Sequence, residues 1–116
     1  MSRATVVDQG DLLVELDGSA VEFEGRDHGS SVSVILVSAD ADGAGPRLHR
    51  HPYDETFVIR GGQALFTVGD QELVGRAGQI IVVPAQVPHK FAKTGTERLE
   101  MMDVHASPVF ITEWLE

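Results

Sequence analysis

The sequence predicts an all-β domain built as a sandwich or barrel. Its apolar residues fall into many short runs rich in β-branched side chains, and most of these runs end at glycine, aspartate or proline. Glycine tolerates the positive φ of tight turns, so Gly61-Gly62 and Gly69-Asp70 are hairpin signals. No long window shows the helical period of an amphipathic helix.

The expected strands follow one another along the chain at residues 12–16, 21–24, 31–38, 55–60, 63–68, 71–74, 80–83, 88–92 and 98–105. The run at 31–38 is rich in Val and Ile, which favour strands. Residues 39–46 are composed of Ala, Asp, Gly and Pro, which is typical of a loop. The tail at 108–116 is the best candidate for a short helix.

Length and composition limit the possible functions. A chain of 116 residues fits one domain, so we expect residues 1–116 to form a single unit. The net charge of −9 disfavours nucleic acid and anionic membrane surfaces as partners. Without cysteine there are no disulfides and no thiolate metal sites. Since no apolar run is long enough for a bilayer and the first residues do not resemble a secretory signal, we expect a cytoplasmic protein.

Two histidines two residues apart are the first candidate site residues. Side chains two apart on a strand share a face, so His49 and His51 should project together. Taken alone, this pair also fits two exposed strand histidines that bind nothing.

Further candidates come from the strands that follow. Glu55 shares strand parity with the core candidates Phe57 and Ile59, so it should point inward, and His89 shares parity with Phe91. A buried carboxylate is costly unless it is paired, and a divalent cation is the usual remedy. Three imidazoles and one carboxylate suit Fe, Mn, Ni, Co, Cu or Zn better than Ca or Mg. Four protein ligands on an octahedral ion would leave two positions open, as catalysis requires.

The spacing of these residues resembles the first motif of the cupin superfamily. In that motif a glycine is followed after five residues by His-x-His, then after three or four by Glu, then after six by glycine. Gly43, His49, His51, Glu55 and Gly62 match every position, over residues 43–62.

Residues 78–93 resemble the second cupin motif, with Gly78, Pro84 and His89 at the expected positions. Gln86 stands where the motif has glycine, and Lys93 stands where it has asparagine. Neither departure removes a ligand. Lys93 is interpreted as a solvated rim lysine, and the alternative is a cation that points toward the site.

The resemblance implies a jelly-roll-like barrel of two antiparallel sheets and one divalent transition metal held by His49, His51, Glu55 and His89. It also implies a homodimer, because cupins commonly pair through their sheets and termini. Glu55 and Tyr53 are the candidate catalytic residues. Tyr53 either donates a hydrogen bond to the site or substrate, or is a loop residue at the barrel mouth.

Several other side chains allow two interpretations. Arg47 and Arg50 would attract a carboxylate substrate or are surface arginines, and His105 is a structural or rim histidine or an added acid–base group in the interior. Trp114 is expected on the outside of the barrel or against a partner subunit. An apolar pocket around the metal, continuous with the core, is expected to be lined by Phe57, Phe66, Phe91 and Met101.

Three function classes remain at this stage. The leading one is a metal-dependent enzyme on a small organic substrate, with dioxygenation ahead of isomerisation, cyclisation or lyase chemistry. The second is a ligand-binding or sensing barrel without chemistry. A storage protein is the third, and the short single barrel with its ordinary composition disfavours it.

Overall fold

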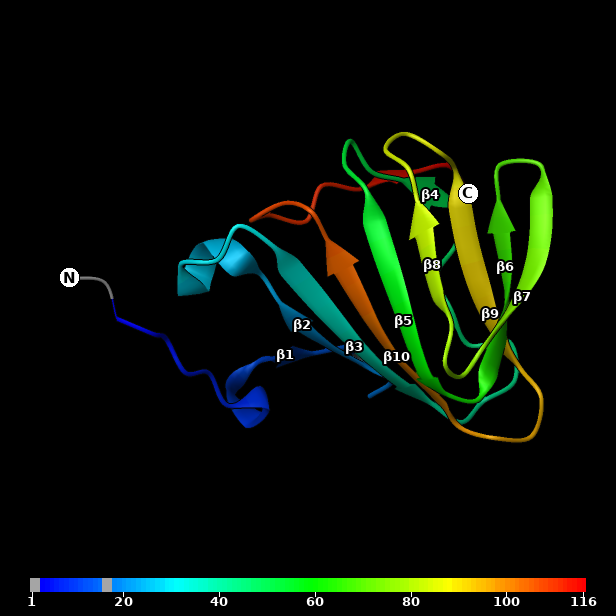
Figure 1. Cartoon of the computed structure of the whole chain (residues 1–116), viewed down its shortest axis with the longest axis horizontal. Helices are drawn as coiled ribbons and strands as arrows, with labels where there is room; N and C mark the ends of the chain where they lie inside the picture. Colours follow the sequence, from blue (N-terminus) through cyan, green and yellow to red (C-terminus); the bar gives the residue numbers. More distant parts are fainter. Residues whose placement is uncertain (1–2, 16–17) are drawn as a thin grey trace.

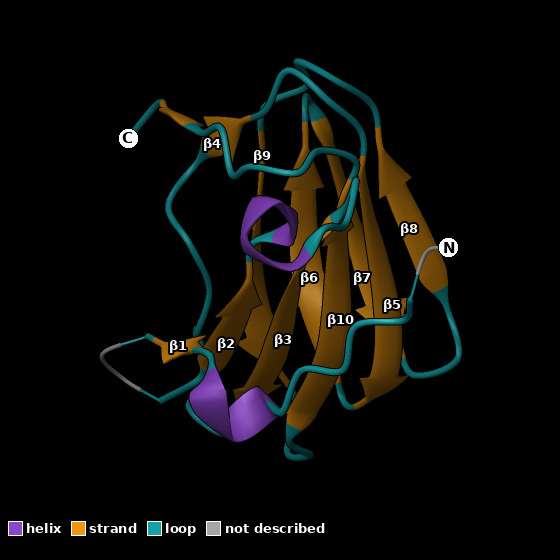
Figure 2. Cartoon of the chain, turned by 90° about the vertical axis from the view of Figure 1, so that its left-hand side faces the viewer, coloured by secondary structure: helices purple, strands orange, loops and turns teal. Residues whose placement is uncertain are grey.

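Two antiparallel sheets pack against each other in the computed structural model, which describes residues 3–15 and 18–116 (Figures 1 and 2). One sheet has six strands in the order β1-β2-β3-β10-β5-β8, and the other has five in the order β11-β4-β9-β6-β7. Consecutive strands repeatedly change sheet, as from β3 to β4 and from β9 to β10. The predicted all-β jelly-roll-like barrel is confirmed.

The strands are β1 (Leu13–Val14), β2 (Ala20–Phe23), β3 (Ser33–Ala39), β4 (His49–Arg50), β5 (Glu55–Gly61), β6 (Gln63–Val68), β7 (Gln71–Arg76), β8 (Ile80–Val83), β9 (His89–Thr94), β10 (Leu99–His105) and β11 (Glu113–Trp114). Two short 3-10 helices, η1 (Gln9–Asp11) and η2 (Gly25–His28), precede β1 and β3. Leu16 and Asp17, which end the expected first strand and begin its turn, lie outside the described residues. Among the described residues, no helix is long and apolar enough to cross a membrane.

Alternation along the central strands builds the core. In β5, Glu55, Phe57 and Ile59 are buried and Thr56 and Val58 are half-buried on the opposite face, as the period of two predicts. The core cluster contains Val37, Ala39, Phe57, Ile59, Ala64, Phe66, Val83, Phe91, Leu99 and Met101. Through Phe57 and Ile59, this apolar packing fixes the position of β5, whose first residue is Glu55.

The tail is not a helix, which corrects the expectation for residues 108–116. Glu113 and Trp114 form β11, paired with β4, and the Leu115 amide donates to the carbonyl oxygen of Leu48. Figure 1 shows the red C-terminal segment beside β4. The exposed edge of β4 satisfies backbone groups of the tail, whereas a helix of nine residues has little stability of its own.

Lys93 is buried, so its interpretation as a solvated rim residue is wrong. It shares the inner face of β9 with His89 and Phe91. Its ammonium group donates to Asp42 Oδ1 at 3.1 Å and to the Gly95 carbonyl oxygen at 2.8 Å. Lys93 lies four positions after His89, which is about 13 Å along the strand. The cation therefore belongs to the other end of the barrel.

Candidate metal centre

The candidate ligands His49, His51, Glu55 and His89 meet at one end of the barrel. One ligand atom from each residue lies within 4.8 Å of all the others, and all four residues are buried. β4 pairs with β9 at His49 and His89, which places these two rings side by side. Glu55 begins β5, so its carboxylate reaches the same point from the facing sheet. The structure thus brings together the four residues that the sequence singled out.

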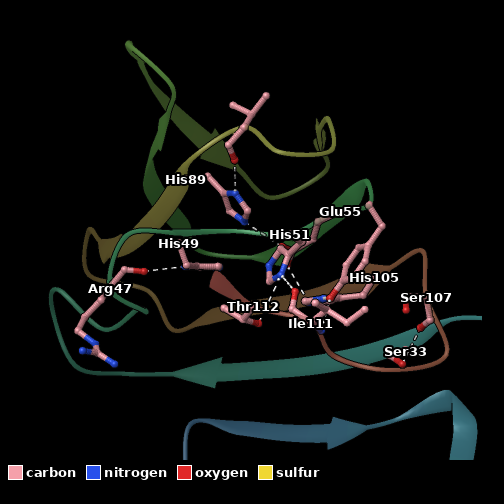
Figure 3. Close-up of polar contacts among 12 residues, drawn as sticks. Ser33, Arg47, His49, His51, Glu55, His89, His105, Ser107, Ile111 and Thr112 are labelled. Carbon is pink, nitrogen blue, oxygen red and sulfur yellow. Dashed lines mark hydrogen bonds and ion pairs between the residues drawn. The ribbon is translucent and has the colours of Figure 1, made fainter. Parts of the chain in front are cut away.

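Each of the three candidate histidine ligands has its Nδ1 beside a backbone carbonyl oxygen. The contacts run from His49 to Arg47 O at 2.6 Å, from His51 to Ile111 O at 2.8 Å, and from His89 to Val87 O at 2.9 Å. Figure 3 shows the rings held in this way around Glu55. A carbonyl only accepts, so each Nδ1–H donates, and in the neutral ring Nε2 then presents a lone pair.

These lone pairs face a carboxylate, and the imidazole nitrogens and the carboxylate together form a donor set for a cation. The Nε2 atoms of His89 and His51 lie 2.9 and 3.1 Å from Glu55 Oε1. Among the described residues, Nε2 of His51 has no hydrogen-bond partner. Backbone carbonyls that orient histidine ligands through the other ring nitrogen are typical of metal sites. The residues therefore fit a divalent transition metal, whose identity the donor set leaves open.

Burial and contacts set the charges of these groups. Burial lowers the pKa of His49 to about 4, so this imidazole is neutral at pH 7. Burial alone would raise the pKa of Glu55, but contacts with His105, His51 and His89 outweigh it and hold the pKa well below its usual range. Glu55 is therefore a carboxylate and His49 a neutral ring, the forms in which both bind metals.

His105 is a fifth buried group at the site, so the rim part of its preferred interpretation is wrong, and its interior position agrees with a structural role and with the acid–base alternative. Only 3% of it is exposed, and it lies opposite Glu55 in the β5–β10 ladder. Its Nε2 is 3.1 Å from Glu55 Oε2, and its Nδ1 is 2.7 Å from the Tyr53 hydroxyl oxygen. Shared parity with Met101 and Asp103 was the signal for an interior position.

Tyr53 connects the loop before β5 to this cluster. Its ring stacks on His51 with centroids 5.0 Å apart and planes 8° apart. Burial raises the pKa of its hydroxyl to about 12, so the phenol keeps its proton. Of the two interpretations of Tyr53, the structure supports the hydrogen-bonding one.

Asp103 is a buried acid that sequence reasoning did not single out. It is 3% exposed on the inner face of β10, and its Oδ1 has no hydrogen-bond partner among the described residues. Burial, and then the charges of Glu55 and Glu15, raise the pKa of Asp103 well above its usual value. A buried carboxyl with a raised pKa keeps its proton over a wider pH range.

A cavity of about 370 Å³ adjoins the metal centre. His49, His51, Glu55 and His105 line one end of it. The other walls include Ala20, Ile35, Val37, Ala39, Phe91, Phe110 and Trp114. Of the four residues expected to line the pocket, only Phe91 does so, because Phe57, Phe66 and Met101 pack in the core below.

The arginines and the tryptophan occupy the rim. The Arg47 guanidinium lies 4.8 Å from the centre of the Trp114 ring and donates to the Glu116 carbonyl oxygen. Arg50 forms a surface ion pair with Glu113 at 2.7 Å, consistent with a surface arginine. Trp114 is half-exposed and lines the cavity, with its ring 5.1 Å from that of His49.

The departure at Gln86 preserves the turn that the motif glycine would make. Gln86 has φ 70°, a left-handed conformation that glycine adopts with less strain. Its amide donates to the His51 carbonyl oxygen at 2.7 Å, and this turn precedes Val87, whose carbonyl orients His89. The second motif therefore supports both histidines from one turn.

The Cupin domain family matches residues 36–105, which include all four candidate ligands. An uncharacterized protein of Streptomyces coelicolor is 30% identical over 92 residues, which are 79% of this chain and 83% of that protein.

Solved structures share the fold. Oxalate decarboxylase from Bacillus subtilis at pH 4.6 has a TM-score of 0.83 at 18% identity, covering 99% of this chain and 33% of that one. The formate complex of oxalate decarboxylase from Lactobacillus farciminis has a TM-score of 0.78 at 21% identity, covering 91% and 34%. This chain thus spans about a third of the length of those decarboxylases. A cupin superfamily protein from Desulfitobacterium hafniense has a TM-score of 0.59 at 28% identity, covering 65% and 66%. With its fold, its ligand geometry and the family match over residues 36–105, the chain belongs to the cupin family.

Proposed function

We propose that this cupin is a metal-dependent enzyme acting on a small, largely apolar organic molecule, with dioxygenation as its leading reaction. The observation that carries the proposal is the opening of the candidate metal centre into a cavity. His49, His51 and Glu55 contribute to its wall, so a molecule in the cavity would lie next to a bound ion. A purely structural metal site is closed by its ligands and needs no such space.

The cavity walls supply binding, and the site supplies charge. Ile35, Val37 and Phe91 form an apolar surface that would hold the body of the substrate and exclude water. A redox-active ion such as iron, copper or manganese would mediate electron transfer from the organic substrate to dioxygen, whereas zinc would act as a Lewis acid. Glu55 and Tyr53 are the chain's candidate groups for holding or moving a proton beside it.

The charges around the cavity favour an uncharged substrate over a small dianion such as oxalate. Among the described lining residues, Arg47 is the one lysine or arginine, and its guanidinium is engaged by Trp114 and Glu116. Glu15 and Glu22 also line the cavity. A dianion would gain little there apart from the metal itself, whereas an apolar ring or chain matches the walls.

The test begins with elemental analysis of protein purified without a histidine tag. We expect near-stoichiometric metal in the wild type, lost in Glu55→Ala and His89→Ala. The matched control is His28→Ala, because His28 stacks on Phe23 at 4.6 Å and is not among the residues that line this cavity. Protein that neither carries nor takes up metal would refute the proposal.

Oxygen consumption with a panel of catechols and 1,3-diketones then separates the function classes. Uptake of oxygen that disappears in His51→Ala and persists in His28→Ala supports the dioxygenase. Metal-dependent product formation without oxygen uptake would indicate isomerase or lyase chemistry. Saturable ligand binding without any product would support the second candidate, a binding barrel, which the cavity alone also permits.

We also propose that the protein is a homodimer formed through the outer face of the six-stranded sheet. Two rows of side chains cross this face without a charged residue: Phe23, Val34, Val104, Thr56 and Val82, and Val21, Leu36, Met102, Val58 and Ile80. Ile80 is 64% exposed and Val82 is 59% exposed. The N-terminal segment lies on the side of this face, where Arg3, Thr5, Val7 and Leu12 line a hollow together with Phe23, Val34 and Leu36, and the part of the face at β5 and β8 lies outside that hollow. A second copy related by a two-fold axis offers the same uncharged surface in return.

Light scattering after size exclusion tests this assembly. The wild type should have the mass of a dimer, and Val82→Lys should have that of a monomer. Gln71→Lys adds the same charge at an exposed position of the other sheet and should leave the dimer intact. A wild-type monomer at micromolar concentration would refute the interface.

A further inference from the structure

The four buried histidines of the site differ in what their Nδ1 atoms face. In His49, His51 and His89 the neighbour is a backbone carbonyl oxygen, which leaves Nε2 free to bind an ion. In His105 the neighbour is the hydroxyl of Tyr53, at 2.7 Å. A hydroxyl donates as well as accepts, so His105 does not have to share the tautomer of the other three.

The surroundings of the Tyr53 hydroxyl decide its direction. The backbone amide of Ile111 donates to this oxygen at 3.3 Å. The hydroxyl keeps one hydrogen to donate, and Nδ1 of His105 is the one acceptor in contact with it among the described residues, so the hydrogen is directed there. This places the proton of the neutral His105 ring on Nε2, which lies 3.1 Å from Glu55 Oε2. Among the described residues, Nε2 of His105 has no hydrogen-bond partner with good geometry, and its one polar contact is the ion pair with Oε2.

The two oxygens of Glu55 consequently face different neighbours. Oε1 lies 3.1 and 2.9 Å from the Nε2 atoms of His51 and His89, on the side of the candidate ligands. Oε2 lies beside His105, which is not among the four residues whose ligand atoms converge. We propose that His105, oriented by Tyr53, is a positioning residue that reserves Oε2 and makes Glu55 bind the metal through Oε1 alone.

This inference rests on the metal centre of the proposed function and adds to it. A carboxylate that binds through both oxygens occupies two coordination positions, and one that binds through a single oxygen occupies one. His105 also lines the cavity. The contacts that run from Tyr53 through His105 to Glu55 therefore keep a coordination position available for a molecule that enters from the cavity.

Cobalt(II) is the probe for the experiment, because its visible absorption weakens as its coordination number rises. Metal-depleted protein is loaded with cobalt, and the spectrum and dissociation constant are recorded for the wild type and for His105→Leu, His105→Gln, Tyr53→Phe and His28→Leu. In His105→Leu, Glu55 is free to bind through both oxygens, so the visible spectrum of the bound cobalt should change while one cobalt still binds. His105→Gln keeps an N–H donor and should return the spectrum toward that of the wild type.

Tyr53→Phe provides a test with little risk to folding. Its ring can keep the stack on His51, while the hydroxyl that orients His105 is lost. We expect its spectrum to shift in the direction of His105→Leu, and we expect His28→Leu to match the wild type.

Three outcomes would overturn the inference. A wild-type spectrum in both His105→Leu and Tyr53→Phe would show that Glu55 needs no positioning. Loss of cobalt binding in His105→Leu as complete as in His89→Ala would make His105 a metal ligand instead. Failure of the wild type to bind cobalt would remove the proposed metalloenzyme together with this inference, so the two failures are distinguishable.

Discussion

Gly62→Ala tests how tightly the hairpin that carries Glu55 is packed. Gly62 lies between β5 and β6 with φ 70°. A Cβ atom there would lie 2.5 Å from the carbonyl oxygen of Arg98 and 3.1 Å from that of Glu97. Both neighbours are backbone atoms in the turn before β10, so neither can rotate away as a flexible side chain would.

The cost has two parts that the structure separates. A left-handed conformation costs an L-residue about 1–2 kcal/mol relative to glycine. Overpacking against backbone adds about 1–3 kcal/mol, and the reduced freedom of the unfolded chain returns about 0.4–1 kcal/mol. We therefore expect Gly62→Ala to lower the free energy of unfolding by about 2–4 kcal/mol.

Gly78→Ala is the matched control, because Gly78 has φ 91° and a Cβ atom added there would meet nothing within 4 Å. It carries the conformational strain without the clash, so it should cost about 1 kcal/mol or less. Urea denaturation at constant m-value measures both variants. Equal losses in the two variants would refute the close approach of Arg98 to Gly62.

Three further predictions concern titration and packing. With metal removed by chelation, lowering the pH from 7.5 to 5 should reduce the free energy of unfolding by about 2 kcal/mol, at roughly 1.4 kcal/mol per pKa unit. The reason is that His49 has a pKa of about 4 in the folded protein, so it takes up its proton first in the unfolded chain. An unchanged urea midpoint would contradict this. Asp103→Asn should be more stable than the wild type at pH 8, and this gain should shrink as the pH falls toward 4. The raised pKa of Asp103 costs stability only at a pH where the same acid is ionised in the unfolded chain. A gain that is independent of pH would exclude this cause. Phe66→Ala should lower the free energy of unfolding by about 3–5 kcal/mol, since Phe66 is fully buried against Phe57. Arg50→Ala removes an exposed ion pair with Glu113 and should lower it by less than about 1 kcal/mol in the same urea measurement.

Strand periodicity and motif spacing predicted much of the site. The period of two correctly oriented His49 and His51 together and turned Glu55 inward with Phe57 and Ile59. Register then follows from burial, because a slip by one residue would expose each of these side chains. The fold and the convergence of the four candidate ligands were therefore within reach of the sequence.

Contacts between distant segments could not be predicted from the sequence. The Tyr53–His105 contact joins positions 52 residues apart, and neither residue belongs to a spaced motif. The tail became a strand because the edge of β4 was available, which no local pattern in residues 108–116 indicates. Strand alternation alone would have placed Lys93 inside the barrel with His89 and Phe91. The residue that makes a buried ammonium group tolerable, Asp42, lies in a loop 51 residues earlier.

The tail strand has a consequence for exchange with solvent. It supplies Trp114 to the cavity wall, and the segment before it supplies the Ile111 carbonyl that orients His51. β11 pairs with β4 through two residues, and its further contacts include one backbone hydrogen bond from Leu115 and exposed side-chain pairs such as Arg50–Glu113, so we expect it to be among the less stable parts of the barrel. Lifting this segment would open the cavity wall and remove the carbonyl oxygen that orients His51, a candidate metal ligand, in the same movement. Entry of a large ligand and escape of the ion are therefore thermodynamically linked, and a ligand that holds the tail closed should slow the loss of metal to a chelator.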